Sequence, residues 1–469
     1  MNNNNQEFKK SLGLLDATML VAGSMIGSGI FIVSSDIARN TGSAGWMMVV
    51  WAISGFMTLA TALSYGELSS MFPRAGGQYV YLKEAYGPLV SFTFGWTFFA
   101  VIQTATIAAV GVAFAKFTAY LFPSLDEDVY LLTIGNYHIS SAQIVAIGVI
   151  LLLTFINTLG VQNGKTVQTT LTIIKILSLI ILVLFGFAAF DKEIWNANWS
   201  SDSTWNLSRL NVDGTTADYT LMAGLGAISA ALVGALFSSD SWHSSSAVAG
   251  EIKNPQRNIG LSLALGTIIV TFIYLLTNLM YTGVLSMQEM ASAPKDRVAM
   301  VAAQEIFGPF GITILAIMIM VSTFGCNNGL IMAGARIYYS MAKDGLFFKK
   351  TKVLNKHAVP GYALWLQGFI ACIWCLTGKY GDLLDMITCV VVIFYVLCII
   401  GIFILRKKRP NEPRPYKAFG FPFIPAIYIV LGLSFILLLV IYKPQFTWPG
   451  IIITLLGIPL YYFVKPKNS

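Results

Sequence analysis

The sequence predicts an all-α membrane protein with many transmembrane helices. Of its 469 residues, 56% are hydrophobic and only 11% are charged, which is about half the charged fraction of a typical water-soluble surface. The apolar residues form continuous runs of about 20, such as Ile173 to Phe190, Leu261 to Tyr281 and Phe421 to Tyr442, and each run can cross a hydrocarbon core about 30 Å thick. A transmembrane β-barrel would show alternating segments of about ten residues. Continuous runs therefore favour helices.

We expect twelve membrane spans, with bounds accurate to a few residues. They lie near 13–38, 44–71, 88–121, 141–160, 166–190, 221–249, 259–285, 307–341, 359–377, 383–405, 420–442 and 447–464. An even number of spans places both termini on one side of the membrane. Outside the spans we expect an N-terminal segment (1–12), a long outer loop (191–220) and a C-terminal tail (465–469).

The distribution of Lys and Arg predicts which side the termini face, because short cytoplasmic loops are enriched in both. Most basic residues fall on the side of the predicted termini. Those predicted on the opposite side are Arg39, Lys192, Arg209, Lys295, Arg297, Lys379 and Lys443. Both termini are therefore expected in the cytoplasm, with the chain in the cell (inner) membrane. The net charge of +8 then reflects topology and contact with anionic lipid headgroups rather than nucleic acid binding.

The cysteines indicate buried thiols rather than disulfides or a metal site. All five lie within predicted spans, at Cys326, Cys372, Cys375, Cys389 and Cys398. Cys372 and Cys375 have C-x-x-C spacing, but they lie in an apolar helix with no second pair and no His nearby. We expect no metal, no cofactor and no enzymatic activity.

The first predicted span is interrupted by glycines near the middle of the membrane. Gly23, Gly27 and Gly29 lie about 10–16 residues into the helix, hence roughly 15–24 Å deep at 1.5 Å per residue. Each glycine lowers helix stability by about 1 kcal/mol relative to alanine, so the helix can unwind there. The alternative is a packing interface, since glycines four residues apart, such as Gly23 and Gly27, let helices approach closely.

The sixth predicted span carries a polar stretch, Phe237 to His243, which contains the acid Asp240. A carboxylate at that depth needs a partner or a cavity, which a packing interface does not explain. Two interrupted helices five spans apart predict an inverted five-span repeat with substrate bound where both helices unwind. The repeats would be 13–190 and 221–405, followed by two further spans in 406–464.

Unwound helices present backbone groups that suit a zwitterion. Free N–H groups at the start of a half-helix attract a carboxylate, and free C=O groups at the end of another attract an ammonium group. We expect the N–H groups of Ser28 and Gly29, with the Ser28 hydroxyl, to bind the carboxylate. The C=O groups of Met25 and Phe237 would bind the amine. The ring of Phe237 could close over the substrate as a gate, or it could serve in packing alone.

Lys175 lies near half depth in the fifth predicted span, too deep for its side chain to reach water fully. A buried ammonium has partners or loses its proton. If charged, Lys175 can fill the place of a bound sodium ion between spans one, five and eight. If it titrates, it can couple transport to protons. A purely structural role, as a partner for backbone carbonyls, is the alternative.

Seven motifs extend along nearly the whole chain in a fixed order. They are Gly23 to Phe31, Tyr65 to Leu68, Phe72 to Leu82, the set Asn157, Gln168 and Lys175, Glu251 to Pro255, Gly334 to Arg336, and Arg414 to Lys417. Together they resemble the amino acid, polyamine and organocation transporter superfamily, and within it the L-type amino acid transporter group.

The resemblance implies the leucine-transporter fold, with twelve spans, a five-plus-five inverted repeat and breaks in spans one and six. It also implies amino acid substrates and sodium-independent transport, by exchange or with protons. The substrate contacts that it implies are Ser24, Met25, Ser28 and Gly29 in span one, Phe237, Ser239 and Asp240 in span six, and Ser322 and Cys326 in span eight.

Span six departs from the pattern F-A-Y-x-G-W-N that members of this group often show. Ser239 replaces an aromatic residue, which would enlarge the pocket, and Ser241 replaces a glycine. His243 either adds a group that titrates near neutral pH or only packs against a helix. Asp240 could attract a cationic side chain or pair within the protein. These departures leave the substrate's side chain open.

Animal members of the group bind a glycoprotein through a cysteine in the loop after span three. The corresponding loop, 122–140, has no Cys, so we expect no disulfide-linked heavy chain and a monomer or weak homo-oligomer. The expected function is alternating-access transport of neutral α-amino acids across the membrane, by exchange or with protons. Alternatives are a sodium symporter, which Lys175 disfavours, and a cationic amino acid or polyamine antiporter, which Asp240 favours. Two alternatives belong to other functional classes. A channel would need a continuous polar pore, whereas ionisable groups occur only at isolated points of the predicted spans. A transporter-like amino acid sensor would need a large cytoplasmic domain, which the predicted loops do not provide.

Overall fold

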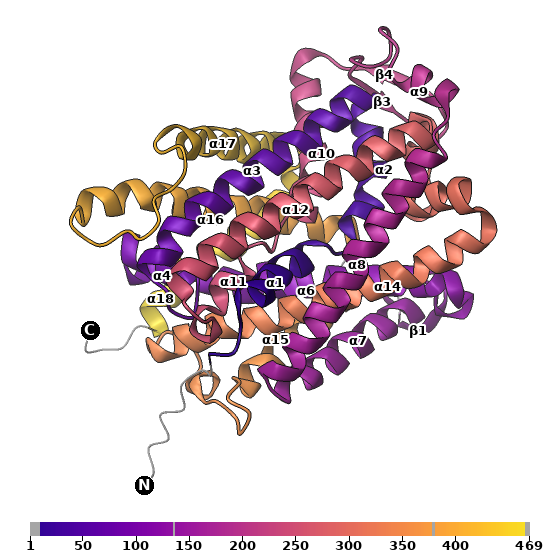
Figure 1. Cartoon of the computed structure of the whole chain (residues 1–469). Coiled ribbons are helices and arrows are strands. Elements are labelled where there is room, and N and C mark those ends of the chain that lie inside the picture. The colour runs from indigo at the N-terminus through magenta and orange to yellow at the C-terminus, as the bar shows by residue number, and fades with distance from the viewer. Residues whose placement is uncertain (1–9, 135–136, 378–379, 465–469) are drawn as a thin grey trace.

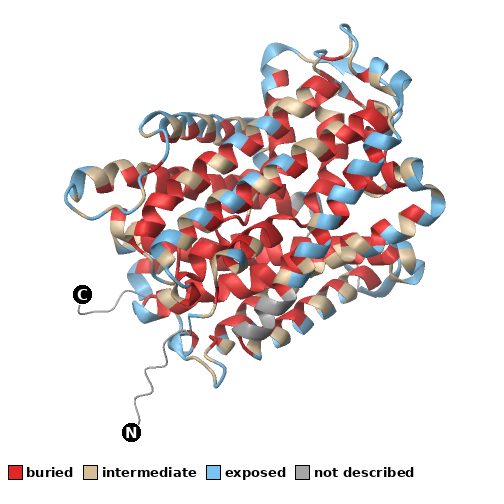
Figure 2. Ribbon diagram, viewed as in Figure 1, coloured by how far each residue is buried: buried red, intermediate tan, exposed pale blue. Residues whose placement is uncertain are grey.

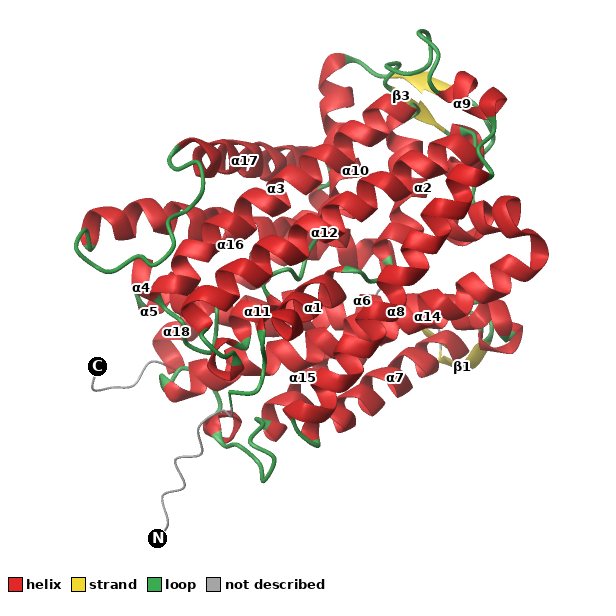
Figure 3. Cartoon of the chain, viewed as in Figure 1, coloured by secondary structure: helices red, strands yellow, loops and turns green. Residues whose placement is uncertain are grey.

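The computed structural model describes residues 10–134, 137–377 and 380–464. The predicted tail at 465–469 and most of the predicted N-terminal segment 1–12 lie outside this range. Helices dominate the described part of the chain (Figure 3), which confirms the predicted class of helical membrane protein with several spans.

The elements follow one another in the order of the predicted spans. The first half contains α1 (Leu14–Met25), α2 (Gly29–Thr41), α3 (Ala44–Met71), α4 (Gln78–Tyr86), α5 (Pro88–Thr97), the π-helix η1 (Phe98–Ile102), α6 (Gln103–Leu121), η2 (Pro123–Leu125), β1 (Tyr130–Ile134), β2 (Tyr137–Ser140), α7 (Ser141–Thr158), α8 (Val161–Ala188) and α9 (Lys192–Asn198). The second half contains β3 (Ser208–Leu210), β4 (Thr216–Asp218), α10 (Leu221–Ser238), α11 (Ser244–Ala247), η3 (Ala249–Glu251), α12 (Pro255–Val284), α13 (Met287–Ala291), η4 (Pro294–Asp296), α14 (Val298–Lys343), η5 (Lys349–Lys352), α15 (Gly361–Thr377), α16 (Tyr380–Lys408), α17 (Phe423–Tyr442) and α18 (Pro444–Val464).

Within the described residues, ten helices are long and apolar enough to cross a membrane. The pair α1 and α2 forms an eleventh candidate, bent by 41° between its two halves. The ninth predicted span corresponds to α15, whose apolar part, Gly361–Leu376, is shorter. The exact number of twelve spans and the inverted repeat therefore remain predictions.

The helices that carry the two breaks lie inside the bundle. α2 packs against α10, α1 and α3 pack against α12, and α14 packs against α6 and α8. Figure 1 shows α3 and α12 running side by side, with α17 at the edge of the bundle, and α10 also packs against α3. Figure 2 shows a buried interior and exposed outer faces, and the exposed faces carry large apolar side chains such as Leu184, Phe272 and Leu437. Such faces suit contact with lipid.

Small elements cover the end of the bundle away from the two termini (Figure 1). The strands β1 and β2 pair antiparallel in the loop after α6, and β3 and β4 pair in the loop before α10. The analysis of spans did not predict these hairpins. The cysteines Cys326, Cys372, Cys375, Cys389 and Cys398 lie in α14, α15 and α16 and form no disulfide in the described part of the chain.

Candidate functional site

The first predicted span is broken where its glycines lie. α1 ends at Met25, and Ile26 leaves the helix with an extended backbone (φ −74°, ψ 90°). α2 begins at Gly29 after Ser28. The first N–H groups of α2 have no acceptor within their own helix, so this start of a helix presents donors near the centre of the bundle. The predicted carboxylate ligands, Ser28 and Gly29, lie there.

The sixth predicted span is broken between Ser238 and Ser244. Phe237 and Ser238 still belong to α10, and the second half consists only of the four-residue α11 and the 3-10 helix η3. The break expected in span six is therefore present, and the part of the span after it holds only these two short helical elements. Ser241 has a positive φ of 66°, and the hydroxyls of Ser244 and Ser246 bond backward to the C=O groups of Ser241 and His243. Such bonds from serine compete with helix formation.

The two breaks lie against each other, with little space between them. A Cβ atom added to Gly29 would lie 2.0 Å from Oγ and 2.9 Å from Cα of Ser238, so only glycine fits at this crossing. The hydroxyl of Tyr274, on α12, bonds to the C=O groups of both Met25 and Ser238, at 3.1 Å each. Sequence reasoning missed Tyr274, since a lone tyrosine in an apolar span gives no signal of this role.

Lys175 on α8 joins the break in the first span to α14. The residue is only 1% exposed. Its Nζ donates to the C=O groups of Gly23 at 2.5 Å, Ile26 at 2.7 Å and Ser322 at 3.2 Å. An ammonium has three N–H donors, so all three are used. Lys175 thus lies between spans one, five and eight, with carbonyl oxygens around its charge.

Two residues of α14 contact the same break. The Ser322 hydroxyl donates to the C=O groups of Ile26 and Gly27 at 3.2 and 3.4 Å, and the Cys326 thiol donates to Ser24 O at 3.0 Å. The hydroxyl of Ser24 is buried and has no hydrogen-bond partner among the residues that the structure describes. An unpaired buried hydroxyl is costly, and a ligand at this break could satisfy it.

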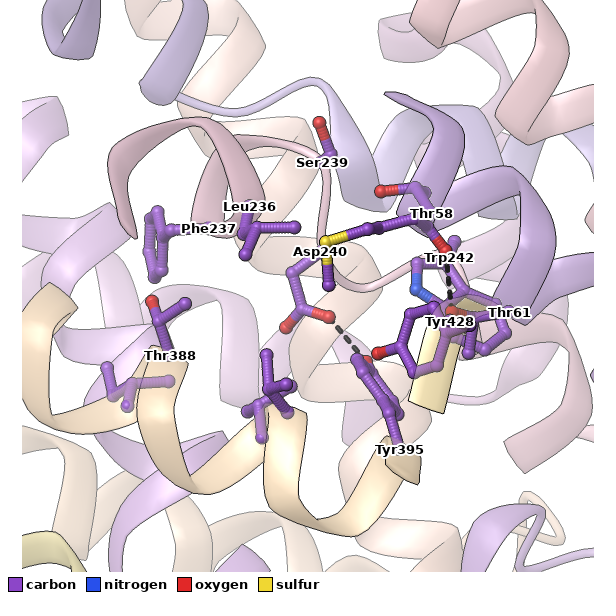
Figure 4. Close-up of a pocket in the computed structure, with 14 residues that line it drawn as sticks. Thr58, Thr61, Leu236, Phe237, Ser239, Asp240, Trp242, Thr388, Tyr395 and Tyr428 are labelled. Atoms are coloured by element: carbon purple, nitrogen blue, oxygen red, sulfur yellow. Dashed lines mark hydrogen bonds between the residues drawn. The ribbon is translucent and has the colours of Figure 1, made fainter. Parts of the chain in front are cut away.

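The predicted residues of span six line a separate, narrow pocket of about 20 Å³ (Figure 4). Phe237, Ser239 and Asp240 face α3, α16 and α17 in this pocket, whereas Ser24, Ser28, Ser322 and Cys326 do not line it. The lining residues are Met57, Thr58, Thr61, Leu236, Phe237, Ser239, Asp240, Trp242, Ile387, Thr388, Val391, Val392, Tyr395 and Tyr428.

Asp240 is held by a residue that the sequence analysis did not identify. Tyr395 on α16 donates its hydroxyl to Asp240 and also lies 3.0 Å from Nδ1 of His243. Ser54 on α3 donates to the Ser239 hydroxyl at 3.2 Å. Asp240 therefore does have a partner within the protein. Tyr395 gave no signal in the sequence, because its neighbours in the span are apolar.

A large hollow lies at one end of the bundle. It has a volume of about 850 Å³, opens at the end away from the termini and is lined by Val33 and Gly234. These residues lie about one helical turn from Gly29 and Phe237, hence close to both breaks. The hollow is also lined by charged residues, among them Asp36, Arg39, Lys116, Glu127, Asp128, Asp296, Asp385 and Lys443.

The end of the bundle that carries the termini is closed below the breaks. Glu251, just after α11, forms an ion pair with Arg336 on α14 at 2.9 Å, and both side chains are 1% exposed. Leu12 pairs with Ile252 as in a short parallel ladder, with the N–H groups of Ser11 and Leu12 donating to Glu251 O. The two ends of the bundle therefore differ: the large hollow lies at one end, and the buried ion pair and this short ladder lie at the other.

The sequence is similar to those of known membrane transporters. Residues 12–462 match the profile of a family described as amino acid permease. The serine/threonine exchanger SteT of Bacillus subtilis is 29% identical over 473 residues, covering all of both chains. The b(0,+)-type amino acid transporter 1 of Mus musculus is 28% identical, covering 97% of this chain and 88% of its own length. The Asc-type amino acid transporter 1 of Mus musculus is 25% identical, and the alignment covers 98% of this chain and 83% of the length of that transporter.

Proposed function

Because this chain belongs to the amino acid permease family, we propose that it carries neutral α-amino acids across the cell membrane by alternating access, without sodium. The carrier works as an exchanger or together with protons. The amino and carboxylate groups of the substrate bind at the facing breaks, among Ser24, Met25, Ser28 and Gly29, with Ser322 and Cys326 beside them. Phe237 lies at the edge of this site and closes over the substrate.

The observation that carries this proposal is the position of the Lys175 ammonium. It donates to two carbonyls at the end of α1 where the break begins, Gly23 O and Ile26 O, and to Ser322 O on α14. Unwound carbonyls at such a break are the groups that bind a coupling cation in related transporter folds. A lysine ammonium in that position supplies the positive charge that a bound sodium ion would otherwise bring, which makes sodium unnecessary.

The geometry of the two ends supports alternating access. The hollow beside Val33 and Gly234 gives a path from one side, while the buried pair Glu251–Arg336 blocks the other. Basic residues collect at the end that carries the termini, for example Arg406 in the last turn of α16 and Arg409 just after it, which favours a cytoplasmic position for that end. The open hollow then faces outward. The relatives are transporters, so the chain is proposed to have no enzymatic activity.

Uptake into liposomes tests this function. Purified protein reconstituted without sodium is expected to take up labelled alanine, serine or leucine. Uptake stimulated by amino acid on the opposite side identifies exchange, and uptake into empty vesicles that follows an imposed pH gradient identifies proton coupling. Binding without any uptake would identify an amino acid sensor instead. An absolute need for sodium would overturn the role given to Lys175.

A cationic substrate is a second candidate, supported by Asp240. Its carboxylate lines the pocket beside the break in span six, and no basic side chain of the described residues forms an ion pair with it. Replacement Asp240→Asn is expected to raise the KM for lysine about tenfold while the KM for leucine stays within about twofold, because only lysine loses a charge interaction. The exposed Asp202→Asn is the control. Equal changes for both substrates would exclude recognition of a cation by Asp240.

A further inference from the structure

Beside the break in span six, three polar side chains form a continuous hydrogen-bonded chain. Tyr395 donates its hydroxyl proton to Oδ1 of Asp240 (Figure 4). Nδ1 of His243 lies 3.0 Å from the same hydroxyl oxygen. Tyr395 and His243 are 6% and 8% exposed. The chain therefore links one edge of the pocket, at Asp240, to a histidine behind the pocket wall.

The chemistry of these groups determines which atom donates in each hydrogen bond of this network. A tyrosine hydroxyl carries one proton and an ionised carboxylate only accepts, so the proton of Tyr395 lies toward Asp240. The contact with His243 then requires a hydrogen on Nδ1, which His243 donates to the hydroxyl oxygen. Both donors point toward Asp240. The bond from Tyr395 occupies one carboxylate oxygen, Oδ1, and holds the carboxylate against α16.

His243 is the member of this cluster whose ordinary pKa lies between about pH 5 and 8, since tyrosine and cysteine have ordinary pKa values of about 10 and 8.5. The histidine is flanked by the rings of Trp242 and Phe98. Titratable side chains that pack near these groups include Tyr65 on α3, Tyr81 on α4, Tyr274 on α12, Cys326 and Tyr338 on α14, Cys398 on α16 and Tyr428 on α17. The Lys175 ammonium is bonded to carbonyls of the break in the first span.

We propose that His243, acting through Tyr395, determines which side chains the carrier accepts. Neutral His243 completes the chain that orients Asp240 toward a cationic side chain in the pocket. Protonation of His243 at Nε2 adds a positive charge two hydrogen bonds from Asp240, and this charge repels a cationic substrate while leaving a neutral one unaffected. Tyr395 is the positioning residue between them. The inference rests on the proposed function and on the pocket as the place of the substrate's side chain.

Competition between lysine and leucine tests the inference in the same liposomes. Lysine is cationic and leucine zwitterionic at both pH values used. For the unaltered protein, the ratio of kcat/KM for lysine to that for leucine is expected to fall about tenfold from about pH 7.5 to about pH 5.5. In His243→Asn, which keeps an N–H donor for Tyr395, the ratio is expected not to change with pH.

Two matched variants, Tyr395→Phe and Tyr338→Phe, distinguish a role of Tyr395 in positioning Asp240 from a role in packing alone. Both changes remove one buried hydroxyl, but the hydroxyl of Tyr338 has no hydrogen-bond partner within the described residues. Tyr395→Phe is expected to raise the KM for lysine about tenfold at about pH 7.5, with the KM for leucine changed less than about twofold. Tyr338→Phe is expected to leave the ratio unchanged. For a variant that does not transport, the shift of the melting temperature with lysine and with leucine gives the same comparison.

Each result decides the inference. A ratio in His243→Asn that still falls with pH, or equal effects of Tyr395→Phe on both substrates, would overturn it. If the unaltered protein takes up leucine, but its ratio of kcat/KM for lysine to kcat/KM for leucine does not change with pH, the inference fails while the proposed function stands. If it takes up neither amino acid and binds neither, the proposed function fails and the inference with it.

Discussion

Replacement of Lys175 by methionine is expected to lower transport by about a hundredfold or more while the protein still folds. The ammonium donates to Gly23 O, Ile26 O and Ser322 O. Methionine has a similar length but no donor, and each buried carbonyl left without a partner costs about 1–3 kcal/mol. The break in the first span would then lose one of the contacts that hold it against α14. Uptake of labelled leucine per folded protein, with folding checked by gel filtration, measures the effect.

The exposed Lys192→Met on α9 is the control for this change. It is expected to transport like the unaltered protein, because Lys192 lies at the surface. Sodium is expected to restore part of the uptake of Lys175→Met, since the freed carbonyl oxygens and the Ser322 hydroxyl are ligands that a small cation can use. Normal sodium-free uptake by Lys175→Met would show that the ammonium has no part in transport.

Replacement of Arg336 by methionine is expected to destabilise the protein by about 3–5 kcal/mol, because it leaves the buried carboxylate of Glu251 without its counter-charge. Both side chains of this pair are 1% exposed. Arg336 also donates to Met332 O at 2.5 Å, and that contact is lost with it. The pair closes the end of the bundle that carries the termini, so that end should also become more accessible. Denaturant unfolding of the purified protein in detergent gives the change in free energy.

A double replacement separates loss of the pair from loss of packing. Glu251→Gln combined with Arg336→Met removes both charges and is expected to recover most of the stability, because no unpaired buried charge remains. Arg257→Met, at an exposed position at the start of α12, is the control and should change stability by less than about 0.5 kcal/mol. A single Arg336→Met variant as stable as the control would show that the ion pair contributes nothing to closing this end.

Most of the helical architecture could be predicted because hydropathy is a local property of the chain. The predicted spans 44–71 and 88–121 coincide with α3 and with α5, η1 and α6. The second half of span six could not be placed in this way. There the chain is rich in serine, and Ser244 and Ser246 bond to the preceding backbone. This local competition leaves only the short α11 and the 3-10 helix η3.

The candidate site could be predicted only in part. The glycines near Gly29 and the acid Asp240 are unusual residues at membrane depth, and this signal is visible in the sequence alone. Their partners give no such signal. Tyr274 lies 249 residues from Met25 along the chain, and Tyr395 lies 155 residues from Asp240. Each is an ordinary tyrosine in an apolar helix until packing brings it to a break.

The sequence by itself therefore determined the membrane-embedded helices, the places where two of them are interrupted and the buried cation Lys175, because length, hydropathy and glycine content act locally. Only the tertiary structure decided what each polar group contacts. It separated the residues around Ser24 and Ser322 from the pocket beside Asp240, and it joined Asp240 to His243 through Tyr395. Such contacts depend on how helices distant in the chain cross, and no local pattern encodes that crossing.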